Sequence, residues 1–178
     1  MEKKYGNYNL KSLRSKIGYV MQDVTILENT IIDNIRYANE NISNEEIEVI
    51  FKKLNLHEKI MNLPNGYETD IYNNPDILSK GEKQLINFAR IMVMNPDVII
   101  LDEVTSSLSY YSEMLLKNAM KQITKGKIAI IIAHRLSTIQ ECDNIIVLEQ
   151  GKIIEQGTND ELLAKKGEYY KLASKNKD

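Results

Sequence analysis

Two adjacent carboxylates, Asp102 and Glu103, directly follow the apolar run of residues 98–101. A run of this kind predicts a strand buried on both faces of a parallel sheet. In open α/β sheets, ligands bind outside the carboxyl ends of the strands. Asp102 can hold Mg²⁺ there, since hard cations prefer carboxylate oxygens, and Glu103 can orient and deprotonate an attacking water. The alternative is that the two acids only end the strand and cap the next helix.

A histidine follows a second apolar run. His134 comes after residues 127–133, which predict another buried strand. Neighbouring parallel strands would bring His134 to the same sheet edge as Asp102 and Glu103, where an imidazole can contact a terminal phosphate. The alternative is a strand-end residue that is hydrogen-bonded to a loop.

Gln22 follows the predicted strand of residues 17–21. Its side-chain amide can ligate Mg²⁺ or a water at the end of that strand. The alternative is an ordinary surface glutamine. The other histidine, His57, lies in a polar helical segment and is given no role.

The sequence from Ser79 to Glu82 fits a helix N-terminus in two compatible ways. Ser79 as the N-cap and Glu82 three residues later form a capping box. The free N–H groups and the positive end of the helix dipole also make an anion site. Gly81 would let a phosphate approach the backbone closely.

Two nucleotide-binding loop motifs are absent from the sequence. None of its eight glycines builds a G-x-x-x-x-G-K-[ST] loop or a G-x-G-x-x-G loop. The chain therefore carries the second half of a nucleotide-hydrolysing site without the first half.

Composition sets outer limits on the function. The 178 residues are 43% hydrophobic and 27% charged, with a net charge of −2, which is typical of one ordinary domain and gives no footprint for nucleic acid. The single cysteine excludes an internal disulfide framework and suits a reducing compartment. No apolar run reaches membrane-spanning length, so any link to a membrane would come through a partner.

The remaining pattern alternates helices with strands, which predicts parallel βαβ units. Capping residues predict helices that begin after Thr30, Ser43 and Thr158. Further helices are expected over residues 79–94, 110–123 and 136–140, and strands over residues 144–149 and 152–156, joined as a hairpin at Gln150-Gly151.

The order and spacing of these motifs resemble the nucleotide-binding domain of an exporter-type ATP-binding cassette (ABC) transporter, from about residue 9 to residue 172. Residues 9–35 resemble the glutamine-loop region, LSKGEKQ the LSGGQ signature and VIILDE the Walker B strand. TSSLS resembles the D-loop, and IIAHRLSTI resembles the switch-histidine strand.

The resemblance implies a role for each site residue. Asp102 and Gln22 would hold Mg²⁺, Glu103 would be the general base and His134 the switch. Ser79, Gly81 and Ser109 would contact ATP. The implied fold is a P-loop NTPase-like, mainly parallel sheet flanked by helices, with a helical subdomain and with the N-terminal part missing. Residues 1–38 would form the glutamine-loop region, residues 39–94 the helical subdomain, and residues 95–178 the remaining core with its C-terminal hairpin and helices.

Several positions depart from the family pattern. The Walker A loop and the nucleotide-stacking aromatic would lie upstream of this sequence. Lys80 replaces the first signature glycine and Glu82 the signature glutamine, and Ser109 stands where the D-loop aspartate is expected. The loop that faces the transmembrane partner in the family has Tyr-Asn-Asn-Pro at residues 72–75 in place of Gly-Glu-x-Gly.

Three functions remain in view. The first is the ATP-hydrolysing component of an exporter, paired head to tail with a second nucleotide-binding domain and held on the cytoplasmic face of the cell membrane by a transmembrane partner. This chain alone would then not turn over ATP. The second is a non-catalytic remnant or regulatory half-site, and the third is a soluble ABC ATPase that acts on DNA or ribosomes. The continuous match through the glutamine loop and AHRLSTI favours the exporter over the third function.

Overall fold

The computed structural model describes residues 9–27, 29–105 and 109–175. They divide after Ile132 into two compact units, and each unit is described by itself. The helices of the first unit are α1 (Leu10–Arg14), α2 (Ile31–Arg36), α3 (Asn44–Lys53), α4 (His57–Met61), the short 3-10 helices η2 (Gly66–Glu68) and η3 (Pro75–Ile77), α5 (Lys80–Met94) and α6 (Tyr110–Thr124). Its strands are β1 (Ile17–Val20), β2 (Val98–Asp102) and β3 (Ile128–Ile132).

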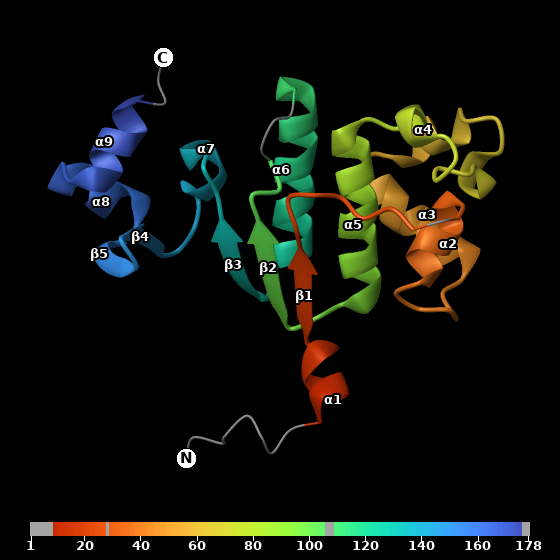
Figure 1. Ribbon diagram of the computed structural model, residues 1–178, viewed down its shortest axis with the longest axis horizontal. Helices are drawn as coiled ribbons and strands as arrows, with labels where there is room; N and C mark the ends of the chain where they lie inside the picture. The colour runs from red at the N-terminus through yellow and green to blue at the C-terminus, as the bar shows by residue number, and fades with distance from the viewer. Residues whose placement is uncertain (1–8, 28, 106–108, 176–178) are drawn as a thin grey trace. The chain divides into compact units, whose positions relative to one another are not determined.

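The three strands of the first unit form a parallel sheet in the order β1-β2-β3 (Figure 1). Val20 lies opposite Leu101, and Asp102 lies opposite Ile132. All three strands therefore end at one edge of the sheet, which is the edge where α/β folds bind ligands. The predicted class, a mainly parallel sheet with flanking helices, is confirmed.

The two faces of this sheet differ in burial. Ile99 and Leu101 point into a core that they share with buried residues of α5 and α6. Alternate residues of β3 point the other way, and Ile128, Ile130 and Ile132 are 67%, 50% and 48% exposed. The prediction that these apolar runs are buried on both faces is therefore wrong for β3. A run of isoleucines marks a strand, but its burial depends on which elements cover each face.

Helices α2, α3 and α4 gather beside α5, away from α6 (Figure 1). Thr30 caps α2 and Ser43 caps α3, each through a complete capping box, so the start of each helix is fixed by neighbouring residues. Helix α3 packs inward through Ile47 and Phe51, which are both buried. None of the helices in the part of the chain that the structure describes combines the length and apolarity needed to cross a bilayer.

The second unit contains α7 (Leu136–Ile139), α8 (Asn159–Lys165) and α9 (Glu168–Lys175), together with the antiparallel strands β4 (Ile145–Glu149) and β5 (Lys152–Gly157). The predicted hairpin is confirmed. Gln150 and Gly151 both have positive φ, 49° and 76°, as a two-residue turn of type I′ requires. The buried residues Leu162 and Tyr169 join α8 and α9 in a small separate core.

Candidate functional site

Asp102 and Glu103 lie where β2 leaves the sheet. Asp102 is the last residue of the strand, and the N–H of Glu103 donates a 2.9 Å hydrogen bond to the carbonyl of Ile132 at the end of β3. Glu103 has φ of 50°, a left-handed conformation that few residues other than glycine adopt. Such backbone outliers cluster at functional sites. The chain thus turns sharply after Asp102, and β3 holds that turn in place.

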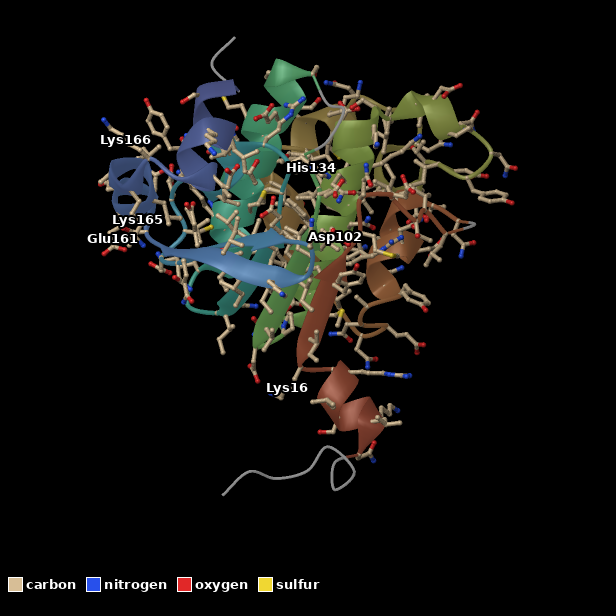
Figure 2. All side chains as sticks on the ribbon, turned by 60° about the vertical axis from the view of Figure 1, so that its left-hand side comes forward. Lys16, Asp102, His134, Glu161, Lys165 and Lys166 are labelled. Atoms are coloured by element: carbon tan, nitrogen blue, oxygen red, sulfur yellow. The ribbon has the colours of Figure 1, made fainter. Side chains whose placement is uncertain are left out.

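A tyrosine on the neighbouring strand fixes the Asp102 carboxylate. The hydroxyl of Tyr19 donates a 2.8 Å hydrogen bond to Oδ2 of Asp102. This bond, followed by burial and by the Asp102 charge, raises the pKa of the Tyr19 phenol above its usual value of 10. Figure 2 shows Asp102 at one end of the sheet and Lys16, which precedes β1, at the other.

The residues at this edge fit Mg²⁺ held mainly by water and phosphate. Across the described ranges, no group of three or more His, Cys, Asp or Glu side chains could cage a metal ion. Mg²⁺ does not need such a cage, because it keeps several waters and is usually bound through one or two carboxylates plus substrate phosphates. Asp102 can supply one carboxylate, and Oδ2 is already oriented by Tyr19.

Gln22 follows β1 at the same edge of the sheet. Since Val20 lies opposite Leu101, the chain beyond β1 leaves the sheet beside the end of β2. The amide of Gln84 on α5 donates a 3.0 Å hydrogen bond to the carbonyl of Met21, the residue before Gln22. The structure therefore places Gln22 on an anchored loop, while its binding to Mg²⁺ stays a prediction.

Ser79 caps the 15-residue helix α5. Its Oγ accepts a 3.3 Å hydrogen bond from the N–H of Glu82, and the Glu82 carboxylate accepts a 2.7 Å hydrogen bond from the N–H of Ser79. The predicted capping box is confirmed. The Ser79 hydroxyl can still donate its own proton to an acceptor such as a phosphate oxygen. However, the Glu82 carboxylate brings a negative charge to the helix end at which such an anion would bind.

Gly81 is buried against α6. A Cβ at position 81 would lie 2.7 Å from Cβ and 2.9 Å from Oγ of Ser112. The absence of a side chain therefore allows α5 and α6 to approach closely, which is a packing reason for glycine at this position. Contact between Gly81 and a phosphate stays a prediction.

Ser109 caps α6 and connects to the same contact. Its Oγ accepts a 3.3 Å hydrogen bond from the N–H of Ser112 and donates a 3.0 Å hydrogen bond to the Ser112 hydroxyl. Ser109, Ser112 and Gly81 thus form one continuous series of contacts between the two helix starts. Residues 106–108 of the predicted D-loop lie outside the described residues.

His134 belongs to the second unit, two residues after β3 ends. Its predicted approach to Asp102 and Glu103 therefore stays a prediction. His57 takes part in a different contact, since its Nδ1 lies 2.8 Å from the hydroxyl of Tyr67. This contact gives His57 a structural role within the helices around α4.

Sequence reasoning missed Tyr19 beside Asp102, Ser112 beside Gly81, and Arg90 on α5. Tyr19 lies in the strand predicted over residues 17–21, but only the pairing of β1 with β2 turns it to the same face of the sheet as Asp102. The contact of Ser112 with Gly81 and that of Arg90 with Thr25 had no local signal, since each joins elements that are distant in sequence.

The sheet topology, the acids at its carboxyl edge and the capped helix define a protein of the P-loop NTPase-like α/β class. The fold matches the solved structure of a bacterial Atm1-family ABC exporter with ATP bound, with a TM-score of 0.83 and 36% identity over 93% of this chain. The ABC transporter family profile matches residues 2–106. The chain therefore belongs to the ABC transporter family, and the predicted resemblance to an exporter nucleotide-binding domain is confirmed.

Curated relatives agree with this assignment. ABC transporter B family member 4 of Dictyostelium discoideum is 46% identical over 94% of this chain. The ATP-dependent lipid A-core flippase of Syntrophus aciditrophicus is 44% identical over 92% of this chain. The chain spans only 22% and 27% of the lengths of these two relatives, and 29% of the Atm1-family exporter.

Proposed function

We propose that this chain is the ATP-binding component of an ABC-type exporter and supplies the signature half of an ATP site. The observation that carries the proposal is the N-terminus of α5, where Ser79 caps a helix that Gly81 seats against α6. A helix N-terminus of this kind favours a phosphate. In the head-to-tail arrangement of the family, Ser79, Gly81 and Ser109 would contact an ATP held by the Walker A loop of a second nucleotide-binding domain.

The acids would serve the other half of the site. Asp102 would hold Mg²⁺ with Gln22, Glu103 would orient and deprotonate the attacking water, and His134 would contact the terminal phosphate. Bound Mg²⁺ would neutralise charge that develops on the phosphate oxygens. Because these 178 residues contain no G-x-x-x-x-G-K-[ST] loop, we expect the chain by itself to hydrolyse ATP negligibly. Substantial Mg²⁺-dependent hydrolysis by the chain alone, lost in Glu103→Gln, would contradict this expectation.

Two partners follow from the proposal. One is the second nucleotide-binding domain, and the other is a transmembrane domain that would hold the chain on the cytoplasmic face of the cell membrane. Relatives named as exporters support this placement, among them a putative multidrug export ATP-binding/permease protein of Staphylococcus aureus, which is 43% identical to this chain.

The decisive experiment is complementation. The chain is mixed with a related ABC domain that keeps its own Walker A loop but whose signature serine is replaced by alanine. Light scattering should show a heterodimer in MgATP and not in MgADP, and Ser79→Ala should abolish it. Ser43→Ala is a matched control, because Ser43 caps α3 through the same kind of box. If both variants weaken assembly equally, the effect is helix capping and the proposed role of Ser79 is wrong.

A regulatory half-site is the second candidate, favoured by the carboxylate of Glu82 beside Ser79. Under this alternative, the mixed pair would assemble in MgATP but would not hydrolyse it. Phosphate release by the pair therefore separates the two functions.

A further inference from the structure

One side of α5 carries three polar side chains in a row, and the two outer ones, Gln84 and Arg90, bond to segments outside the helix. Gln84, Asn87 and Arg90 follow one another at intervals of three residues, so they lie on the same side of the helix. Gln84 is only 2% exposed, and no described buried side-chain nitrogen or oxygen lacks a hydrogen-bond partner. Asn87 and Arg90 are half-buried, so this row of side chains is not a fully solvated helix face.

Arg90 uses its guanidinium group to join several segments. Nε donates a 2.8 Å hydrogen bond to the carbonyl of Asn34, and one terminal nitrogen donates to the carbonyl of Thr25 at 2.7 Å and to Oδ1 of Asn87 at 2.8 Å. The other terminal nitrogen donates to Oδ1 of Asn34. The planar guanidinium group presents five N–H donors in a fixed arrangement, which suits this set of acceptors.

The partners of this row bracket the loop that contains Gln22. Gln84 bonds the carbonyl of Met21, just before Gln22, and Arg90 bonds the carbonyl of Thr25, three residues after it. Asn34, which also bonds Arg90, holds the loop a little further along the chain, because its Oδ1 accepts a 2.9 Å hydrogen bond from the N–H of Leu27. Both ends of the loop are thus tied to the helix that Ser79 caps.

We infer that Arg90, with Gln84, is a positioning residue that fixes the glutamine loop to the signature helix, so that Gln22 and Ser79 move as one body. The significance of Gln22 rests on the proposed function, but the mechanical link does not. A shift of α5 would carry the carbonyls of Met21 and Thr25 with it. Without the link, the loop would lose its hydrogen bonds to α5 at the carbonyls of Met21 and Thr25.

The link is tested by the mobility of a nitroxide label at position 23, which is exposed on the loop. The label is placed on Asp23→Cys in a Cys142→Ala background, and no nucleotide is needed. The mobility measurement would therefore still test the link if the ATP-dependent assembly experiments failed. We expect Arg90→Ala to shorten the rotational correlation time of the label on the order of twofold, as a loop gains motion on the nanosecond scale. Arg90→Lys should not restore the wild-type correlation time, because a single ammonium group cannot replace the fork of the guanidinium group.

Two controls separate positioning from general loosening. Arg36→Ala removes an arginine of the neighbouring helix α2 that bonds Asn44, and it should leave the label at position 23 unchanged. A second label at Lys53, exposed at the end of α3, should stay unchanged in every variant.

An Arg90→Ala protein that melts at a lower temperature but keeps an immobilised label at position 23 would overturn the inference. If neither Arg90 variant folds, Gln84→Met decides, since it removes the bond to Met21 at nearly constant volume. The label should then become more mobile, and an unchanged spectrum would also overturn the inference.

Discussion

The Tyr19 hydroxyl donates a 2.8 Å hydrogen bond to Oδ2 of Asp102, across 83 residues of sequence. The two side chains project from neighbouring strands on the same face of the sheet. An oriented carboxylate presents its remaining lone pairs in a fixed direction, and partners of this kind are a common means of holding a metal ligand in position.

The first prediction concerns the ionisation of Tyr19. Because its pKa is raised chiefly by the hydrogen bond to Asp102, the phenol should titrate above its usual value of 10, and Asp102→Asn should lower its pKa. A raised pKa stabilises the fold below pH 10, and this contribution is lost as the pH rises through the higher folded-state value. Tyrosine-selective NMR titration, with Tyr19→Phe to assign the signal, measures both effects. An unchanged pKa in Asp102→Asn would contradict the assigned cause.

The second prediction concerns the contact between Gly81 and Ser112. In Gly81→Ala the new Cβ would lie 2.7 Å from Cβ of Ser112, so α5 and α6 must move apart. We expect the free energy of unfolding to fall by about 1–3 kcal/mol, as overpacking typically costs. Urea denaturation measures the change.

A pair of second-site changes tests the cause of that loss. Ser112→Gly in the Gly81→Ala background removes the clashing Cβ and should recover stability, less about 1 kcal/mol for glycine in a helix. Ser112→Ala keeps the Cβ and should recover none. If both second changes restore stability equally, the steric explanation is wrong.

Capping and turn chemistry were the most predictable parts of this fold. The boxes at Ser43, Ser79 and Thr158 depend on residues three apart, and all three form as the sequence predicts. The hairpin at Gln150-Gly151 likewise follows from local backbone preference. Such contacts need no knowledge of the rest of the chain, so a single sequence contains them.

Long-range contacts within the site could not be predicted in the same way. The sequence identifies Asp102 as a strand-end acid, but the register that brings Tyr19 to it arises only when β1 pairs with β2. Gly81 could be interpreted as a phosphate contact from its motif, and its packing against Ser112 depends on the position of α6. The prediction that β3 is buried on both faces failed for the same reason, since the sequence of a strand does not encode which of its faces is covered.

The third prediction concerns the charge of Glu82. Its carboxylate accepts a hydrogen bond from the N–H of Ser79 at the helix end where the proposed phosphate would bind. Glu82→Gln keeps an oxygen that can accept this bond but removes the negative charge, so MgATP-dependent assembly with the partner domain should tighten severalfold. Assembly is measured by light scattering over a range of MgATP concentrations.

Salt provides the control for this effect. Raising the ionic strength should bring the wild-type chain and Glu82→Gln closer together in their affinity for the partner domain, because screening weakens repulsion between separated charges. Raising the ionic strength should not strengthen the assembly of the Ser79→Ala protein with the partner domain. Weaker assembly in Glu82→Gln would show that its capping bond matters more than its charge.

The fourth prediction concerns the exposed apolar face of β3. Exposed apolar side chains on an edge strand favour self-association, because they combine unpaired backbone groups with surface that avoids water. We expect the isolated chain to form oligomers, and Ile130→Lys, at a side chain that is 50% exposed, should reduce them without lowering the melting temperature. Val49→Lys is the matched control, since Val49 is equally exposed at 50% but lies on α3. The masses of the three proteins, measured by light scattering as concentration rises, decide the point. A wild-type chain that stays monomeric, or equal effects of the two lysines, would show that the β3 face does not drive association.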